Sequence, residues 1–241
     1  WFDSGSMPFA QWHYPFENKD RFKTNFPADF IAEGVDQTRG WFYTLHALGT
    51  MLFDEPAYKN VVSNGLVLDE NGEKMSKSKG NSVDPFEVIQ KYGADTVRWY
   101  MMSNSSPWEN LRFSEDGLQD TQRKFFNTIV NTYSFFAMYA NIDGFTYSGT
   151  PIPVNDRHEM DRWIISKSNT TVKLVDEYLD EYEPTKAARE VEAFVEELSN
   201  WYVRRNRRRF WKEGKSLDKT AAYQTLYECL TDLSKLISPI A

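Results

Sequence analysis

The residues with the clearest capacity for chemistry are three lysines that alternate with serines in a short segment. The segment reads Gly72-Glu73-Lys74-Met75-Ser76-Lys77-Ser78-Lys79-Gly80-Asn81. Ammonium groups three residues apart in a glycine-flanked loop can converge on a polyphosphate, and serine hydroxyls add hydrogen-bond donors. The G-x-x-x-x-G-K-[ST] spacing of a Walker A loop is absent. On composition alone, a solvated surface loop is the competing interpretation.

The segments before this loop predict an α/β layer that would position it. Residues 26–34 have the pattern of a short strand that ends in a glycine turn, and residues 41–53 are apolar and long enough for a helix. Residues 60–68 have the pattern of a second strand, interrupted by Gly65. Strand, helix and strand in this order predict one βα unit.

From about residue 83 onward the pattern is helical. Asp84-Pro85 predicts the start of a helix that stops at Tyr92-Gly93. Further helix starts are predicted at Ser114, before Met160, at Pro184 and at Ser216. Four long amphipathic helices joined by short links predict an antiparallel bundle.

Composition excludes several classes of protein. Apolar residues make up 41% of the 241 residues and aromatic residues 16%, which is enough for a packed core and argues against disorder. A single cysteine, Cys229, excludes a disulfide framework and a multi-cysteine zinc site, and it favours a reducing compartment. No apolar run approaches the roughly 18–20 residues of a membrane span. We therefore expect a cytoplasmic protein without a membrane partner.

The net charge of −7 hides two opposite blocks. Residues 176–197 hold nine acids and two bases, whereas residues 201–215 hold five arginines, two lysines and one glutamate. At 100° per residue, the expected core face of the 184–210 helix includes Arg205 and Arg209, so both are predicted to be bonded to acids or carbonyls across the bundle. The outward side chains are candidates for nucleic-acid phosphates, although a solvated basic face paired with the acidic block is the alternative. These outward candidates are Arg204, Arg207, Arg208 and Lys212.

The loop described first resembles a known motif. Residues 74–78 spell KMSKS, and this sequence is similar to the signature of the class I aminoacyl-tRNA synthetases. The resemblance implies ATP, an amino acid and tRNA as substrates. It also implies that the nucleotide is held by Lys74, Met75, Ser76, Lys77 and Ser78, with Lys77 the main phosphate ligand and Lys74 assisting. Positive charge at these positions would stabilise the negative charge that grows on the leaving pyrophosphate.

Three further segments resemble the isoleucyl members of that family: residues 1–6 (WFDSGS), 33–42 (EGVDQTRGWF) and 200–205 (NWYVRR). The resemblance implies that Trp1 and Trp41 flank the isoleucine side chain and that Gln37 orients the substrate. It also implies adenylate or ATP contacts, with Glu33 on the adenylate, Asp36 on the ribose, and close backbone approach at Gly34 and Gly65. Thr38 and Asn64 depart from the family pattern, in which histidine is common at both positions. The HIGH motif of the family is missing from the chain, so half of the ATP site is missing too.

The resemblance divides the chain into three parts. Residues 1–66 correspond to the C-terminal half of a Rossmann-like catalytic domain, residues 67–112 to the KMSKS loop and a stem-contact segment, and residues 113–241 to a helical anticodon-binding domain. The implied reaction is ATP-dependent activation of L-isoleucine and its transfer to tRNA(Ile). Mg²⁺ would arrive with the ATP, and the chain shows no metal site of its own.

The first hypothesis is an enzyme fragment. The chain starts without methionine, and we interpret it as an internal piece excised from a longer, monomeric enzyme and inactive on its own. The sequence leaves two alternatives open. A stand-alone, non-catalytic tRNA-binding module is the second hypothesis. A synthetase for another branched amino acid is the third, and Gln37 and Trp41 argue against it.

Overall fold

The computed structural model describes residues 1–147 and 150–241, with the side chain of Lys77 left out of the description. The chain separates into two compact units, each described by itself. The first unit comprises Trp1–Lys74 with Pro107–Arg112, and the second comprises Met75–Ser106 with Phe113–Ala241. No helix in the described ranges is both long and apolar enough to cross a membrane.

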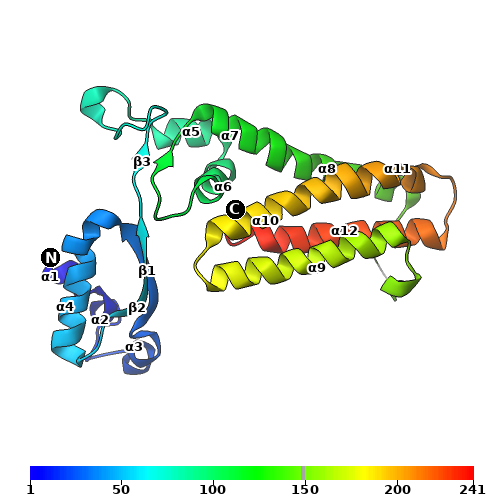
Figure 1. Ribbon diagram of the computed structural model, residues 1–241. Coiled ribbons are helices and arrows are strands. Elements are labelled where there is room, and N and C mark those ends of the chain that lie inside the picture. Colours follow the sequence, from blue (N-terminus) through cyan, green and yellow to red (C-terminus); the bar gives the residue numbers. More distant parts are fainter. Residues whose placement is uncertain (148–149) are drawn as a thin grey trace. The chain divides into compact units, whose positions relative to one another are not determined.

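The first unit is organised around two parallel strands and the helix between them (Figure 1). Strand β1 (Ala28–Gly34) pairs with β2 (Tyr58–Asn64), in a register that runs from Ala28 opposite Tyr58 to Gly34 opposite Asn64. Helix α4 (Trp41–Phe53) connects the two strands. Its side chains Phe42 and Leu45 are buried with Ile31 of β1. The predicted strand–helix–strand unit is thus confirmed, and the parallel pairing follows from it.

The remaining elements of this unit are short. They are α1 (Phe2–Gly5), α2 (Met7–Ala10), α3 (Lys19–Asn25), the 3₁₀ turn η1 (Val35–Arg39), β3 (Val67–Leu68) and β4 (Leu111–Arg112). The strand predicted over residues 60–68 is divided in two, because the chain leaves β2 before Gly65 and resumes in β3, which pairs in parallel with β4. Short helices of this kind hold their positions by packing: the Phe22 ring stacks on Tyr14 and Phe26 at centroid distances of 4.2 and 4.9 Å.

The second unit is helical. Its described residues form the 3₁₀ turns η2 (Lys77–Lys79) and η4 (Val154–Asp156), the π-helical turns η3 (Gln122–Phe126) and η5 (Glu197–Val203), and eight α-helices. The α-helices are α5 (Pro85–Tyr92), α6 (Ala94–Asn104), α7 (Glu115–Thr121), α8 (Asn127–Asp143), α9 (Glu159–Asp180), α10 (Pro184–Glu196), α11 (Arg204–Trp211) and α12 (Leu217–Ile237).

Several helix starts are fixed by side-chain caps that the sequence predicts. The Asp84 carboxylate accepts a hydrogen bond from the Phe86 amide at 2.8 Å. The hydroxyls of Ser114 and Ser216 accept from the amides three residues later, at 3.1 Å in both cases. Each cap satisfies an amide that has no partner inside its helix, and such caps typically contribute about 1 kcal/mol.

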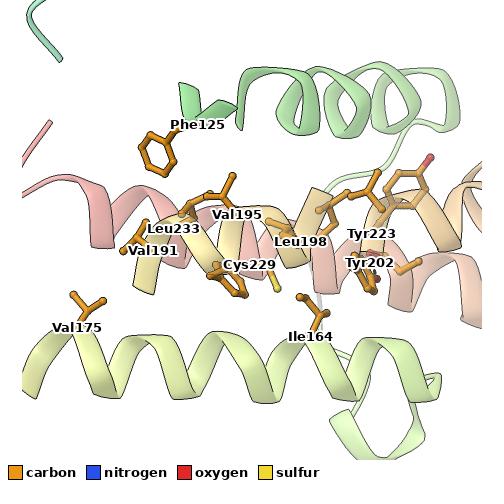
Figure 2. Packing of buried hydrophobic residues seen from close by; sticks show 14 of the residues in the cluster. Phe125, Ile164, Val175, Val191, Val195, Leu198, Tyr202, Tyr223, Cys229 and Leu233 are labelled. Carbon is orange, nitrogen blue, oxygen red and sulfur yellow. Dashed lines mark hydrogen bonds between the residues drawn. The ribbon is translucent and has the colours of Figure 1, made fainter. Parts of the chain in front are cut away.

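The core of the second unit lies where α8, α9, α10 and α12 pack together (Figure 2). Ile164 and Val175 extend from α9 toward Val191 of α10, Leu198 of η5 and Cys229 of α12. Burial raises the pKa of the Cys229 thiol, so the thiol packs as a neutral apolar group.

Helix α6 joins this core although the sequence analysis did not predict it. Its Trp99 is completely buried, stacks on Phe125 at 4.2 Å and donates from Nε1 to Glu192 Oε1 at 2.8 Å. These contacts attach α6 to both the α7–α8 segment and α10. The hydrogen bond to Glu192 offsets the desolvation cost of burying the indole N–H, and it helps to fix how α6 packs on α10.

The two arginines predicted to be structural behave differently. Arg209 is buried and donates from Nη1 and Nη2 to the two carboxylate oxygens of Asp161, at 2.7 Å each, which confirms the prediction for that residue. The prediction for Arg205 is wrong, because its side chain is exposed and its guanidinium lies over the ring of Trp201. The π-helical turn η5 inserts an extra residue before α11, so Asn206 rather than Arg205 occupies the core face.

The buried Asp161–Arg209 pair predicts a large and specific loss of stability. Asp161→Ala leaves the Arg209 guanidinium without its carboxylate partner, and we expect the free energy of unfolding to fall by about 3–5 kcal/mol. Asp120→Ala is the control, because Asp120 also contacts two cations, Arg123 and Lys124, but does so in solvent. Urea unfolding of both variants should show a large shift for the first and little for the second. Equal shifts would contradict the assignment.

A second ion pair predicts a pH-dependent stability. The carboxylate of Asp143 lies 2.5 Å from the ammonium of buried Lys219 and accepts from the Tyr223 hydroxyl. Burial raises the pKa of Asp143, but the hydrogen bonds from Lys219 and Tyr223 lower it by a larger amount. The pKa of Asp143 therefore lies below its usual value. The stabilisation is therefore present at neutral pH and disappears as the pH falls through this depressed pKa, below about 4.

Asp143→Asn should consequently lower the free energy of unfolding by roughly 1.5–3 kcal/mol at pH 7, and the difference from the parent chain should shrink between pH 5 and pH 3. Urea unfolding across this pH range measures it. Asp176→Asn, an exposed change on α9, is the control. A difference that stays constant with pH would show that the charge of Asp143 is not responsible.

Candidate functional site

Three of the site residues implied by the resemblance lie at one edge of the small sheet. Glu33 and Gly34 end β1 opposite Ser63 and Asn64 of β2, and Asp36 follows in η1. The carboxyl ends of parallel strands lie at the same edge, which is where α/β folds bind their ligands. The structure therefore places these residues where a ligand is expected.

Gln37 organises the next part of this edge. Its side-chain oxygen accepts from the Trp41 amide at 3.0 Å, and its side-chain nitrogen donates to Asp36 Oδ2 at 3.1 Å. The oxygen serves as a cap for the start of α4 in place of a cap from Gly40, which carries no side chain. Gln37 thus ties the carboxylate of Asp36 to the first turn of the helix.

The two tryptophans lie near this glutamine. Trp41 is half-buried and donates from Nε1 to the Ser4 carbonyl at 3.0 Å, which fixes its ring against the first turn of the chain. Trp1 is 76% exposed, yet its ring lies so close to Gly40 that a Cβ there would stand 3.1 Å from Trp1 Cζ3. Trp1 thus lies beside Gly40, the residue that precedes Trp41 in the chain.

Gly34 and Gly65 are glycines for different structural reasons. A Cβ on Gly34 would lie 2.6 Å from Asp36 Oδ1, so glycine lets the carboxylate fold back toward the strand end. A Cβ on Gly65 would lie 2.3 Å from the Glu109 carbonyl oxygen, and the Gly65 amide donates to the Pro107 carbonyl at 2.8 Å. The chain's own backbone therefore approaches Gly65 closely, and the predicted nucleotide contact at this glycine stays a prediction.

The lysine–serine loop is built from two turns. In the first unit, Asp69 Oδ1 accepts hydrogen bonds from the amides of Asn71 and Glu73, at 3.0 and 2.7 Å. Lys74 forms an isolated antiparallel β-bridge with Leu68. This side-chain turn brings the chain to Lys74 in a defined conformation. The sequence analysis did not single out Asp69, although an Asp three residues before a Gly is a recognisable turn signal.

In the second unit, the hydroxyl and amide of Ser76 hold the rest of the motif. The Ser76 amide donates to Asn81 Oδ1 at 2.9 Å, and its hydroxyl accepts from the Lys79 amide at 3.2 Å. The Ser78 hydroxyl lies 3.2 Å from that of Ser76, and Met75 is half-buried. The side chain of Lys77 lies outside the described part of the structure. The two serines thus fix the conformation of the loop, in addition to supplying hydroxyl groups as hydrogen-bond donors.

The basic side chains of α11 form a separate feature in the second unit. Arg204, Arg207, Arg208 and Lys212 are all exposed, and within residues 1–147 and 150–241 no ion pair involves them. Glutamates of the acidic block pair with other lysines instead, such as Glu197 with Lys167 at 2.9 Å. The interpretation of these arginines as partners of the acidic block therefore has no support.

Over the same described ranges, no group of three or more histidine, cysteine, aspartate or glutamate side chains is arranged to hold a metal ion.

Two family models match separate segments of the chain. Residues 1–114 match the family model "tRNA synthetases class I (I, L, M and V)". Residues 161–241 match the model "Anticodon-binding domain of tRNA ligase". The chain therefore belongs to the class I aminoacyl-tRNA synthetases.

Individual relatives narrow the similarity to one branch of this family. Isoleucine–tRNA ligases of Cytophaga hutchinsonii and Bacteroides fragilis are each 62% identical to the chain over its full length. The corresponding enzyme of Clostridium novyi is 56% identical over 99% of the chain. The chain spans only 22%, 21% and 23% of these three relatives, respectively.

Solved structures show the same fold. The Agrobacterium radiobacter K84 agnB2 LeuRS, in a ternary complex with tRNA and LeuAMS, covers 98% of the chain with a TM-score of 0.71 and 21% identity. Methionyl-tRNA synthetase of Mycobacterium tuberculosis, in complex with methionyl-adenylate, covers 96% with a TM-score of 0.77 and 21% identity. The chain covers 30% and 45% of those two structures.

The contact at Gly65 gives a testable consequence for the site's framework. Gly65→Ala places a methyl group against the Glu109 carbonyl, so the segment that leaves β2 must shift and the first unit should unfold more readily. We expect a loss of about 1–3 kcal/mol in the free energy of unfolding, measured by hydrogen exchange of the β2 amides. Glu109→Ala is the control, because it removes the exposed side chain of the partner residue and leaves its backbone carbonyl in place. Unchanged β2 protection in Gly65→Ala would contradict this account.

Proposed function

We propose that the chain is part of an isoleucine–tRNA ligase, and that the full-length protein activates L-isoleucine and transfers it to tRNA(Ile). In the first step the isoleucine carboxylate attacks the α-phosphate of ATP, which forms isoleucyl-adenylate and releases pyrophosphate. In the second, a hydroxyl of the terminal tRNA ribose attacks the carbonyl of the adenylate and releases AMP. Neither step requires a nucleophile from the protein.

The observation that carries the proposal is the full-length similarity to isoleucine–tRNA ligases, taken together with the residues at the carboxyl edge of β1 and β2. Glu33 and Gly34 would contact the aminoacyl-adenylate, and Asp36 would accept hydrogen bonds from the ribose hydroxyls. The hydrogen bond from Gln37 already orients the Asp36 carboxylate before any ligand binds. A preorganised acceptor loses less conformational freedom on binding.

Isoleucine would bind between Trp1 and Trp41. A branched aliphatic side chain suits an aromatic slot, because its recognition depends on contact area rather than on hydrogen bonds. Trp41 is the fixed wall of the slot, since its indole N–H is held by the Ser4 carbonyl. Gln37 is held at the base of the same helix, where its amide can orient the substrate.

Lys74 and Lys77 would act on the phosphates. Negative charge grows on the leaving pyrophosphate, and ammonium groups placed there lower the energy of the transition state more than that of the bound ATP. The loop backbone supports this role because Asp69 fixes the approach to Lys74 and Ser76 fixes the turn that carries Ser78. Mg²⁺ enters with ATP as part of the substrate and neutralises the phosphates.

The remaining parts of the chain would serve tRNA binding. In this proposal residues 1–66 form the second half of a Rossmann-like domain, residues 67–112 the KMSKS loop and stem-contact segment, and residues 113–241 the helical anticodon-binding bundle. Arg204, Arg207, Arg208 and Lys212 would neutralise tRNA phosphates. We further propose that the full-length enzyme is a cytoplasmic monomer.

The test is amino-acid-dependent ATP–pyrophosphate exchange by the full-length protein. We expect exchange with isoleucine and much weaker exchange with valine or leucine. Lys77→Ala should lower the exchange rate about 10²- to 10³-fold, because it removes a charge that acts in the transition state.

Lys59→Ala is the matched control, because Lys59 is an exposed lysine paired with Asp29 and lies outside the proposed site. It should exchange at the parent rate. Exchange that prefers another amino acid would overturn the isoleucine assignment, and a Lys77→Ala variant with the parent rate would overturn the role of the loop.

A further inference from the structure

An exposed tryptophan on the second unit has an arginine stacked on it. Trp201, in the π-helical turn η5, is 52% exposed, and the guanidinium carbon of Arg205 lies 5.4 Å from its ring centroid. The two side chains line a hollow of about 500 Å³ together with Met160, Trp163, Glu159 and Glu197. The hollow has an aromatic and cationic wall, which distinguishes it from an ordinary surface depression.

The geometry of η5 produces this arrangement. In an uninterrupted α-helix Arg205 would turn toward the core, but the π-helical turn rotates it outward, beside Trp201. A guanidinium plane held beside an indole presents a flat surface that attracts π-systems. Because all nucleobases have a π-face, unpaired nucleotides stack on such surfaces without regard to sequence.

The charges nearby favour a nucleic acid over a protein as the occupant. Arg204 is adjacent to Arg205, and Arg208 lies one helical turn further along the same side of α11. Both are exposed, and in the described part of the chain neither takes part in an ion pair. A strand whose base stacks on Trp201 would have its phosphates beside these two cations.

Two carboxylates also face the hollow, and they narrow the set of bases that we expect to bind there. Glu197 is neutralised by Lys167, which lies 2.9 Å away. Glu159 is exposed at the start of α9 and can accept a hydrogen bond from an amino group on a base edge. Cytosine, adenine and guanine carry such an amino group, and uracil does not.

We propose that Trp201 and Arg205 form a stacking platform for an unpaired, amino-bearing nucleotide of the bound tRNA, with its flanking phosphates on Arg204 and Arg208. The inference rests on the proposed function for the identity of the RNA. It adds a base-stacking site built from residues other than those proposed to bind the amino acid and ATP.

The test compares tRNA binding by the full-length protein and three variants across a salt series. Trp201→Leu removes the aromatic face and should weaken binding about 5- to 150-fold, the equivalent of one lost base stack. The slope of log affinity against log salt should stay unchanged in this variant, since stacking releases no counterions. Trp201→Phe should bind nearly as well as the parent, and Arg208→Ala should reduce the slope by about one phosphate contact.

Short homopolymers test the base preference. Oligo(C) should bind the parent protein more tightly than oligo(U), and Glu159→Gln should reduce the difference. Equal affinity for the two oligomers in the parent protein would overturn the amino-group part of the proposal.

The platform itself is overturned if Trp201→Leu binds tRNA as tightly as the parent, or if Trp201→Phe loses as much affinity as Trp201→Leu. Thermal unfolding checks that both variants remain folded, which is expected because the ring is half-exposed. ATP–pyrophosphate exchange does not depend on this platform. Parent-level exchange together with unchanged tRNA binding would therefore contradict the platform and leave the proposed function intact.

Discussion

The second unit depends on one buried ion pair, between Asp161 at the start of α9 and Arg209 in α11. Asp161 is completely buried, and its two oxygens accept from Arg209 at 2.7 Å, while the Tyr202 hydroxyl donates to the same carboxylate at 2.6 Å. Arg209 also donates to Asp218, which begins α12. Such a pair is tolerated inside a protein only when its hydrogen-bonding groups find partners, and this one is nearly saturated.

The protonation states of this network follow from its surroundings. Burial alone would lower the pKa of Arg209, but the carboxylates of Asp161 and Asp218 raise it overall, so the guanidinium stays charged. Burial, together with the charge of Asp161, raises the pKa of Tyr202 well above its usual value, so the phenol remains a donor. Both groups therefore act as hydrogen-bond donors, and the network links α9, α11 and α12.

This ion pair also decides which arginines reach solvent. Because Arg209 is fixed toward α9, the rotation of α11 about its axis is fixed, and Arg204, Arg207 and Arg208 must point outward. The π-helical turn before α11 adds Arg205 to the exposed set and brings it onto Trp201. A single buried carboxylate thus determines the composition of the basic surface that we assign to tRNA.

Local sequence signals predicted much of this fold. The turn residues around α4 and the capping residues Asp84, Ser114 and Ser216 act through neighbours a few positions away, so they could be recognised without a structure. Helix α6 escaped prediction because its apolar residues cluster at 99–102 instead of recurring every three to four positions. The outward turn of Arg205 could not be predicted either, since a π-helical turn arises from packing across the unit.

In the candidate site too, contiguous motifs could be predicted from the sequence, but contacts between distant residues could not. The KMSKS and EGVDQTRGWF segments were recognisable as contiguous patterns, whereas the partner of Arg209 lies 48 residues away and only folding brings the two together. The contact between Gly65 and the backbone of Glu109 could not be predicted for the same reason, because 44 residues separate the two positions in the sequence.

The most direct measurement is the salt dependence of tRNA(Ile) binding by the full-length protein, with Arg204, Arg207 and Arg208 all changed to Gln. If these three side chains face the tRNA backbone, the slope of log affinity against log salt should fall by two to three, at about 0.7–0.9 for each phosphate released. An unchanged slope and affinity would contradict the account, because α11 would then present its arginines to solvent alone.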